Sequence, residues 1–268
     1  MPLSPELIDI IIDNLHNDKR SLSACCLISK QWVPSCRFHL FSKITVTPHR
    51  ISSMLHFLES HSPSIASLVR NLVVDDFSEW GLDEDPEEGT RLCFPADKLR
   101  HIFLLLRSVE HLHIHNCYHV IKSDMFSVLA NVRELVMEDI RLTSLQHTLS
   151  FVYAFPKLET LSIIGRSTWG DRSSPPYRYK TRPGQPSFSL RKLDLNDSHI
   201  SSISQWLLGL DPVPPIFSLS LYVVVDAPQS SIALLRSIGH LVLTLELKLW
   251  NLFLSDGMYP MCWIFSLF

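Results

Sequence analysis

A short pattern of apolar positions recurs along most of the chain. It consists of an apolar residue, two further residues, a second apolar residue, one more residue and a third apolar residue. The pattern begins seven times, at Val69, Val109, Val132, Leu158, Leu190, Ile216 and Val242. The alternation at its end is typical of a strand with one face in a core. We therefore expect seven short strands with their apolar positions buried.

The spacing of these strands predicts a repeating architecture. Successive starts lie 40, 23, 26, 32, 26 and 26 residues apart, and four of the six intervals fall in the range of leucine-rich repeats. Apolar residues at helical spacing occur between the strands, in residues 96–106, 123–130, 143–155, 200–210 and 228–239. The pattern therefore predicts an α/β fold, a leucine-rich-repeat-like solenoid over residues 64–268. Its short parallel strands line the concave face and its helices the convex face.

The two long intervals contain predicted loop insertions. Residues 75–89 hold eight acidic side chains and no basic one, whereas residues 166–186 are basic and rich in proline and serine. Both are expected to be solvated loops. The stretch after the last predicted strand is apolar. We expect it either to fold back as a cap or to belong to a longer array.

The first residues show the pattern of short helices instead. Ser4 and Pro5 suit the N-cap and the first position of a helix, and apolar residues then follow at helical spacing. A second helix is expected around Leu22, a third from Pro34 to about residue 41, and a linker helix in residues 47–63. Three such helices form a small domain that usually needs a partner or a neighbouring domain.

This segment resembles an F-box. The residues that carry the resemblance are Leu3, Glu6, Leu7, Ile8, Ile11, Leu15, Leu22, Leu27, Ile28, Ser29 and Trp32. Its ending, WVPSCRFHLF, is similar to that of F-box proteins of mushroom-forming fungi, although the expected proline stands one place late, at Pro5. The resemblance implies a three-helix F-box over residues 1–46.

The resemblance also implies partners. An F-box binds the adaptor Skp1, which joins it to a cullin-based ubiquitin ligase. By their position in the pattern, the residues implied to contact or support the adaptor are Leu3, Pro5, Ile8, Leu22, Cys25, Ile28 and Trp32.

Composition narrows the class of protein. The net charge of −3 gives no general attraction to nucleic acid or to acidic membranes. The six cysteines form no CxxC pair, and the start of the chain does not read as a signal peptide. No apolar run approaches the roughly 20 residues of a membrane span. We expect reduced, structural cysteines in a cytoplasmic or nuclear protein, and nothing indicates a homo-oligomer.

The stretch HLHIHNCYH, residues 111–119, concentrates histidines. Because side chains alternate along a strand, Leu112 and Ile114 are expected to face the core and the histidines to face away. Cys117 is expected to face inward, apart from the histidines, so the sequence predicts no metal site and no cofactor. The concave positions predicted to bind a target are His111, His113, His115, Glu134, Val136, Glu138, Lys192, Asp194, Asn196 and Tyr222.

These features predict a non-catalytic receptor subunit of a Skp1–cullin–F-box ubiquitin ligase, with an unidentified protein as its target. The chain contains no GxSxG, HExxH, Walker or GxGxxG motif. Two alternatives stay open. One is a leucine-rich-repeat scaffold outside any ligase, and the other is a metal-dependent enzyme built on His111, His113 and His115.

Overall fold

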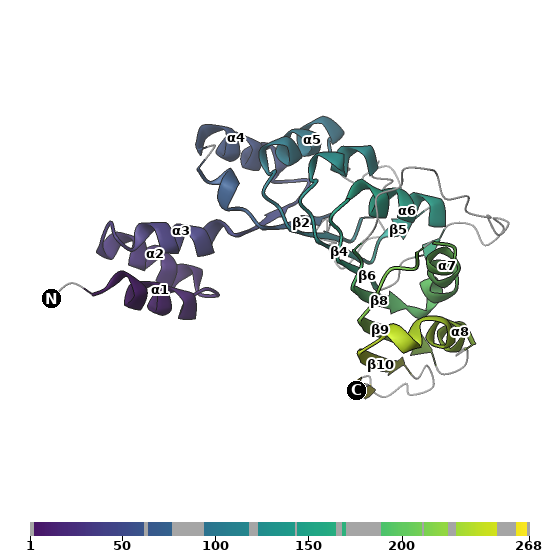
Figure 1. Ribbon diagram of the computed structural model, residues 1–268. Helices are drawn as coiled ribbons and strands as arrows, with labels where there is room; N and C mark the ends of the chain where they lie inside the picture. The colour runs from purple at the N-terminus through teal and green to yellow at the C-terminus, as the bar shows by residue number, and fades with distance from the viewer. Residues whose placement is uncertain are drawn as a thin grey trace, which may run out of the picture. The chain divides into compact units, whose positions relative to one another are not determined.

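The structure, a computed structural model, is an α/β protein. It describes residues 3–61, 64–76, 94–117, 123–142, 144–164, 168–169, 189–210, 212–224, 229–250 and 261–266. The chain divides into two compact units between Leu112 and His113, inside strand β3 (His111–His115). Figure 1 shows the elements of both units.

The first unit begins with three helices, α1 (Pro5–Asn14), α2 (Lys19–Ile28) and α3 (Val33–Phe41). Ser4 caps α1, because its hydroxyl oxygen accepts the N–H of Leu7 at 3.4 Å. Asp18 caps α2 by accepting the N–H groups of Arg20 and Ser21 at 3.0 and 3.1 Å. The predicted three helices are thus confirmed. The first two begin after a capping side chain, and Pro34 stands in the first turn of the third.

These helices have a hydrophobic core of their own. Its buried residues are Ile8, Ile12, Leu22, Cys25 and Cys36, with Leu15, Cys26, Trp32 and Leu40 packed against them. Burial, together with the neighbouring Cys26 and Cys25, raises the pKa of the Cys36 thiol to about 12. Cys36 therefore stays a neutral thiol and behaves as a small apolar side chain.

A short parallel sheet follows in the first unit. Strand β1 (Lys43–Val46) pairs with β2 (Asn71–Asp75), and β3 comes next in the strand order. Helix α5 (Ala96–Leu105) packs against α4 (Ile51–His61), which is the predicted linker helix. The sequence interpretation placed residues 43–46 in the helical domain, but they form a strand because Ile44 and Val46 alternate with polar residues and are buried.

The second unit repeats a strand and a helix. Its strands β4 (Glu134–Glu138), β6 (Thr160–Ile164), β8 (Lys192–Asn196), β9 (Ser218–Val224) and β10 (Thr244–Trp250) follow β3 in that order. From β4 to β10, each strand pairs in parallel with the next one in this order.

Helices connect these strands. Helices α6 (Leu145–Ala154), α7 (Asp197–Leu208) and α8 (Gln229–Ile238) lie on one side of them (Figure 1). The predicted helix at 123–130 is the short 3₁₀ helix η2 (Ser123–Val128). Strands β5 (Arg141–Leu142) and β7 (Thr168–Trp169) pair separately, and β7 lies within the predicted basic loop.

The repeated pattern forms the core that the sequence predicts. All seven patterns coincide with strands, and of their twenty-one apolar positions twenty are buried, while Leu247 is half-buried. Aromatic residues fill the space behind the strands: the ring of Phe126 lies 5.2 Å from that of Phe151 and 6.3 Å from that of Phe155. The indole N–H of Trp206 donates to the hydroxyl of Tyr153 at 3.0 Å.

The apolar stretch near residue 268 folds back on the repeat. Its strand β11 (Met261–Ser266) pairs antiparallel with β10, from Thr244 opposite Ser266 to Leu249 opposite Met261. Most of the two predicted loop insertions lies outside the described residues, as does Cys93. Among the described helices, none is both long and apolar enough to cross a membrane.

Candidate functional site

The first candidate surface is apolar and lies on the three helices. Twelve large apolar side chains are strongly exposed in the described residues, and seven of them fall within residues 3–41. We call these seven the exposed apolar set: Leu3, Leu7, Ile10, Ile11, Leu27, Ile28 and Phe38. Leu27 and Ile28, at the end of α2, are the most open, with 89% and 66% of their surface accessible.

Helix α1 shows how the set arises. Ile8 and Ile12 stand one turn apart and enter the core. Leu7 and Ile11 stand one turn apart on the adjacent row and are exposed. The apolar residues at helical spacing therefore form two rows, and only one of these rows is buried. The missing signal was the width of this face, which exceeds what a core of three short helices covers.

The residues implied as adaptor-binding fall into two groups. Leu3, Pro5 and Ile28 are exposed, and Trp32 is half-buried. Ile8, Leu22 and Cys25 are buried in the core of the three helices. The second group therefore cannot contact a partner while the helices are folded, and its members support the surface from beneath. The implied set also lacked Leu7, Ile10, Ile11, Leu27 and Phe38.

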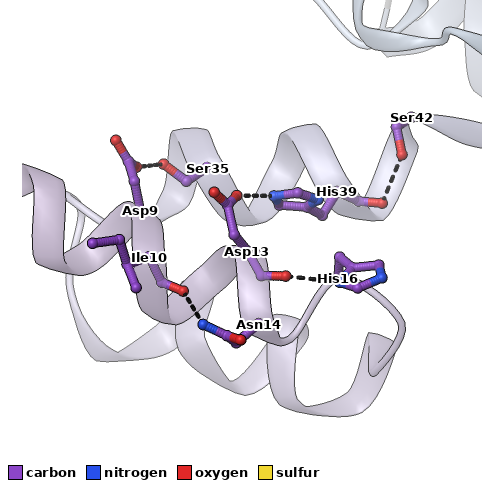
Figure 2. A network of polar contacts seen from close by, with 8 residues as sticks. All are labelled: Asp9, Ile10, Asp13, Asn14, His16, Ser35, His39 and Ser42. Carbon is purple, nitrogen blue, oxygen red and sulfur yellow. Dashed lines mark hydrogen bonds and ion pairs between the residues drawn. The ribbon is translucent and has the colours of Figure 1, made fainter.

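A polar network ties α1 to α3 on a further face. Figure 2 shows Asp9 and Asp13 of α1 pointing toward Ser35 and His39 of α3. The Ser35 hydroxyl donates to Asp9 at 2.5 Å, and His39 Nε2 lies 2.8 Å from Asp13 Oδ1. His16 Nδ1 also lies 2.7 Å from the carbonyl oxygen of Asp13. Core packing and these bonds together hold α1, so its exposed row is presented by a fixed helix.

The second candidate surface is the polar side of the strands in the second unit. Side chains there alternate with the buried core positions and bond across neighbouring strands. The hydroxyl of Ser162 donates to Asp194 Oδ2 at 2.6 Å, and that of Ser220 donates to Glu246 Oε2 at 2.9 Å. We call this the polar strand face, formed by His113, His115, Glu138, Ser162, Lys192, Asp194, Ser220, Tyr222, Glu246 and Lys248.

The predicted target-binding positions lie away from the core, as expected. His111 and Lys192 are exposed and the other eight are half-buried, whereas Leu112, Ile114 and Cys117 are buried. The inward placement of Cys117 is confirmed, and its thiol donates to the carbonyl oxygen of His115 at 3.4 Å. The alternation predicted along the histidine strand therefore holds through His115. It ends at Asn116, which has a φ of 53°, and Cys117 is buried beyond it.

Charges on the polar strand face are paired within it. Lys248 Nζ donates to the Tyr222 hydroxyl at 2.8 Å, sits 4.5 Å from the centre of its ring and lies 3.3 Å from Glu246 Oε2. Burial lowers the pKa of Lys248, but the Tyr222 bond and the Glu246 charge outweigh it, so the pKa is raised. Lys192 Nζ similarly lies 3.5 Å from Asp194 Oδ2. This face thus offers oriented donors and acceptors.

The histidines meet carboxylates at one edge of this face. His113 Nε2 lies 3.0 Å from Glu138 Oε2, and the rings of His113 and His115 are 5.5 Å apart. One potential ligand atom from each of His115, Glu138 and Asp139 lies within 4.8 Å of the other two. In the part of the chain that the structure describes, this is the group that could hold a metal. The sequence analysis predicted no metal site, and the group differs from the His111, His113 and His115 of the enzyme alternative.

The two surfaces differ in what they can bind. The exposed apolar set gains free energy by being covered, whereas the polar strand face selects a partner by hydrogen bonds and charge. A comparison with models of known protein families and one with curated proteins found no match for this chain. Its function is therefore argued from these two surfaces.

Proposed function

We propose that this chain is a substrate-receptor subunit of a Skp1–cullin–F-box ubiquitin ligase in the cytoplasm or nucleus. The three helices act as an F-box that docks on a Skp1-like adaptor. The strand–helix units act as a leucine-rich-repeat-like solenoid that holds a target protein. The chain itself is non-catalytic in this proposal, and other subunits transfer ubiquitin to the target held nearby.

The exposed apolar set is the observation that carries the proposal. Scattered exposed apolar residues are normal, but seven within residues 3–41 compare with five in all the other described residues. Covering one such side chain fully contributes about 1.5–3 kcal/mol. Apolar side chains concentrated in this way mark interaction sites, and an F-box needs such a site.

The separate core of the helices favours docking over an internal role. If the helices were a cap on the repeat, their apolar rows would pack against it. Instead, the nine residues of their core all come from residues 8–40, and the other described residues of the first unit leave the exposed apolar set uncovered. This supports an external partner over the scaffold alternative, in which no adaptor binds.

The position of the set suggests how the adaptor would dock. Leu27 and Ile28 end α2, and Leu7 and Ile11 form a row on α1. Helices fixed by their own core lose little freedom on binding, which favours affinity. We expect Leu27 and Ile28 to be the binding hot spot, because they have the most surface to bury.

Target recognition is assigned to the polar strand face. Its groups are already oriented by bonds such as Ser162 to Asp194 and Lys248 to Tyr222. A pre-oriented polar surface discriminates between partners, because a wrong partner removes water from its donors and acceptors without replacing the lost hydrogen bonds. The polar strand face therefore suits the target protein, and the exposed apolar set suits the Skp1-like adaptor.

Co-purification with a Skp1-like adaptor tests the proposal. The full chain should form a stable complex, and Leu27→Lys/Ile28→Lys should weaken adaptor binding by at least tenfold. Lysine at the end of a helix interacts favourably with the helix dipole, and both positions are exposed, so the fold should persist. Leu208→Lys is the matched control, because Leu208 is exposed and ends α7. A wild-type chain that binds no adaptor would contradict the proposal.

Target binding needs a separate variant. Lys192→Ala/Tyr222→Phe removes two polar groups of the strand face and keeps the tyrosine ring. Quantitative capture should show this variant losing target proteins while retaining the adaptor. The α2 variant should show the reverse. If both variants lost the same proteins, this result would contradict the assignment of adaptor and target to separate surfaces.

A further inference from the structure

We infer that His115, Glu138 and Asp139 bind one divalent first-row transition ion, with Zn²⁺ as the ion of choice. The site would lie at the ends of strands β3 and β4. It concerns residues that the ligase proposal does not use for adaptor docking, and it stands whether or not that proposal holds.

The strands bring the three ligands together. His115 is the last residue of β3, Glu138 is the last of β4, and Asp139 follows directly. The two strands are neighbours in the sheet, and the N–H of Asn116 donates to the carbonyl oxygen of Glu138 at 3.1 Å. The ends of the strands are therefore tied to each other by the backbone next to the ligands.

The distances suit a single ion after a small rotation of the side chains. The ligand atoms lie within 4.8 Å of one another. Zinc binds nitrogen and oxygen at about 2.0–2.2 Å, so two ligands of one ion lie at most about 4.3 Å apart. All three side chains are half-buried, which leaves them room to close and leaves a path for the ion.

The donor set selects the class of ion. One imidazole nitrogen with two carboxylate oxygens suits Zn²⁺ and its neighbours, whereas Mg²⁺ and Ca²⁺ favour oxygen ligands alone. The charge of a divalent ion would neutralise the two adjacent carboxylates of Glu138 and Asp139. Three protein ligands leave one tetrahedral position for water.

Neighbouring side chains orient the ligands. His113 Nε2 contacts Glu138 Oε2 at 3.0 Å, which leaves the other carboxylate oxygen to face the ion. The side-chain nitrogen Nδ2 of Asn116 lies 3.2 Å from His115 Nδ1. Metal binding through His115 Nε2 places the ring proton on Nδ1, so the Asn116 amide must turn and present its oxygen to accept that proton. His113 and Asn116 are thus assigned as positioning residues.

Metal titration of the purified full chain, with tags removed and metals stripped by chelator, tests the inference. Calorimetry and equilibrium dialysis with ZnCl₂ should show one ion per chain, and excess Mg²⁺ should not displace it. His115→Ala and Asp139→Asn should each weaken binding at least tenfold. Asp139 has a φ of 48°, which asparagine also tolerates, so Asp139→Asn should keep the local backbone.

Matched controls exclude general surface binding. His111 and Glu134 stand on the same two strands and the same face, four residues before the proposed ligands. His111→Ala and Glu134→Gln should leave the affinity unchanged. All variants should melt at the wild-type temperature without metal. Absence of saturable one-to-one binding, or equal binding by wild type and Asp139→Asn, would overturn the inference.

Discussion

The three helices and the strand–helix units leave opposite kinds of side chain uncovered. Residues 3–41 expose seven large apolar side chains. The polar strand face instead carries half-buried charged and polar groups, which bond one another or the buried Ser162 and Ser220. An apolar surface binds with little directional demand. A polar one binds only partners that satisfy its geometry. The contrast is consistent with the proposal of two different partners, a Skp1-like adaptor and a target protein.

This difference in uncovered side chains arises from the different side-chain periodicities of strands and helices. Along a strand, side chains alternate between two faces, so Leu193 enters the core while Asp194 lies half-buried on the polar strand face. Around a helix, a wide apolar stripe exceeds what one neighbour covers, so Ile8 is buried and Leu7 is not. The helical segment thus retains apolar surface for binding without losing its own core.

Shortening a buried side chain in the core of the three helices should have the largest effect on stability, and it should affect the helices alone. Ile12→Ala should destabilise the helices by about 2–5 kcal/mol, because Ile12 is fully buried. The strands of the second unit should keep their hydrogen-exchange protection, since the helical core is separate. Ile11→Ala, one residue earlier and exposed, should change stability by less than about 0.5 kcal/mol. Equal loss of protection in helices and strands would show a single shared core.

Removing a bond of the polar strand face should have a smaller effect. Ser162→Ala removes the 2.6 Å bond to Asp194, and we expect a loss of about 1–2 kcal/mol in urea denaturation, because the acceptor is charged. A double-mutant cycle with Asp194→Ala isolates the pair. Strictly additive energies would mean that the two side chains do not stabilise each other.

Thiol labelling should show which region opens first. Cys36 lies in the helical core and Cys117 in the strand core, and both are buried. The small helical core should open more readily. Peptide-level mass spectrometry at sub-denaturing urea should therefore find Cys36 alkylated about tenfold faster than Cys117. Identical rates across all urea concentrations would mean that both open in one cooperative step.

The polar network of α1 and α3 should contribute least. Asp13→Asn weakens the contact with His39, but Asp13 is two-thirds exposed, and exposed pairs contribute up to about 1 kcal/mol. We expect a loss below that value in urea denaturation. A loss comparable to that of Ile12→Ala would show that this network, and not the apolar core, holds α1 in place.

The sequence was sufficient to predict the seven strands of the repeat, but it was not sufficient to predict strands β1 and β11 at the two ends of the sheet. The apolar triplets identified seven strands because each carries its burial signal within six residues. Strand β1 was missed because four residues next to a helix gave too short an alternation. Strand β11 was missed because an apolar stretch shows its pairing with β10 only through tertiary contacts.

Prediction of the candidate sites from the sequence has the same limit, because local patterns are readable and tertiary contacts are not. The face of His113 followed from alternation, which is local. The approach of Glu138 and Asp139 to His115 depends on how β3 and β4 align, and one sequence does not contain that register. The division of α1 into a buried and an exposed row likewise depends on where α2 and α3 pack.

Hydrogen exchange with and without a Skp1-like adaptor tests the central claim most directly. The account predicts a stable complex in which added protection is confined to α1, α2 and α3, the helices that carry the exposed apolar set. The strands of the second unit should exchange as they do in the free chain. Absence of a complex, or added protection in those strands with none in the helices, would contradict the account.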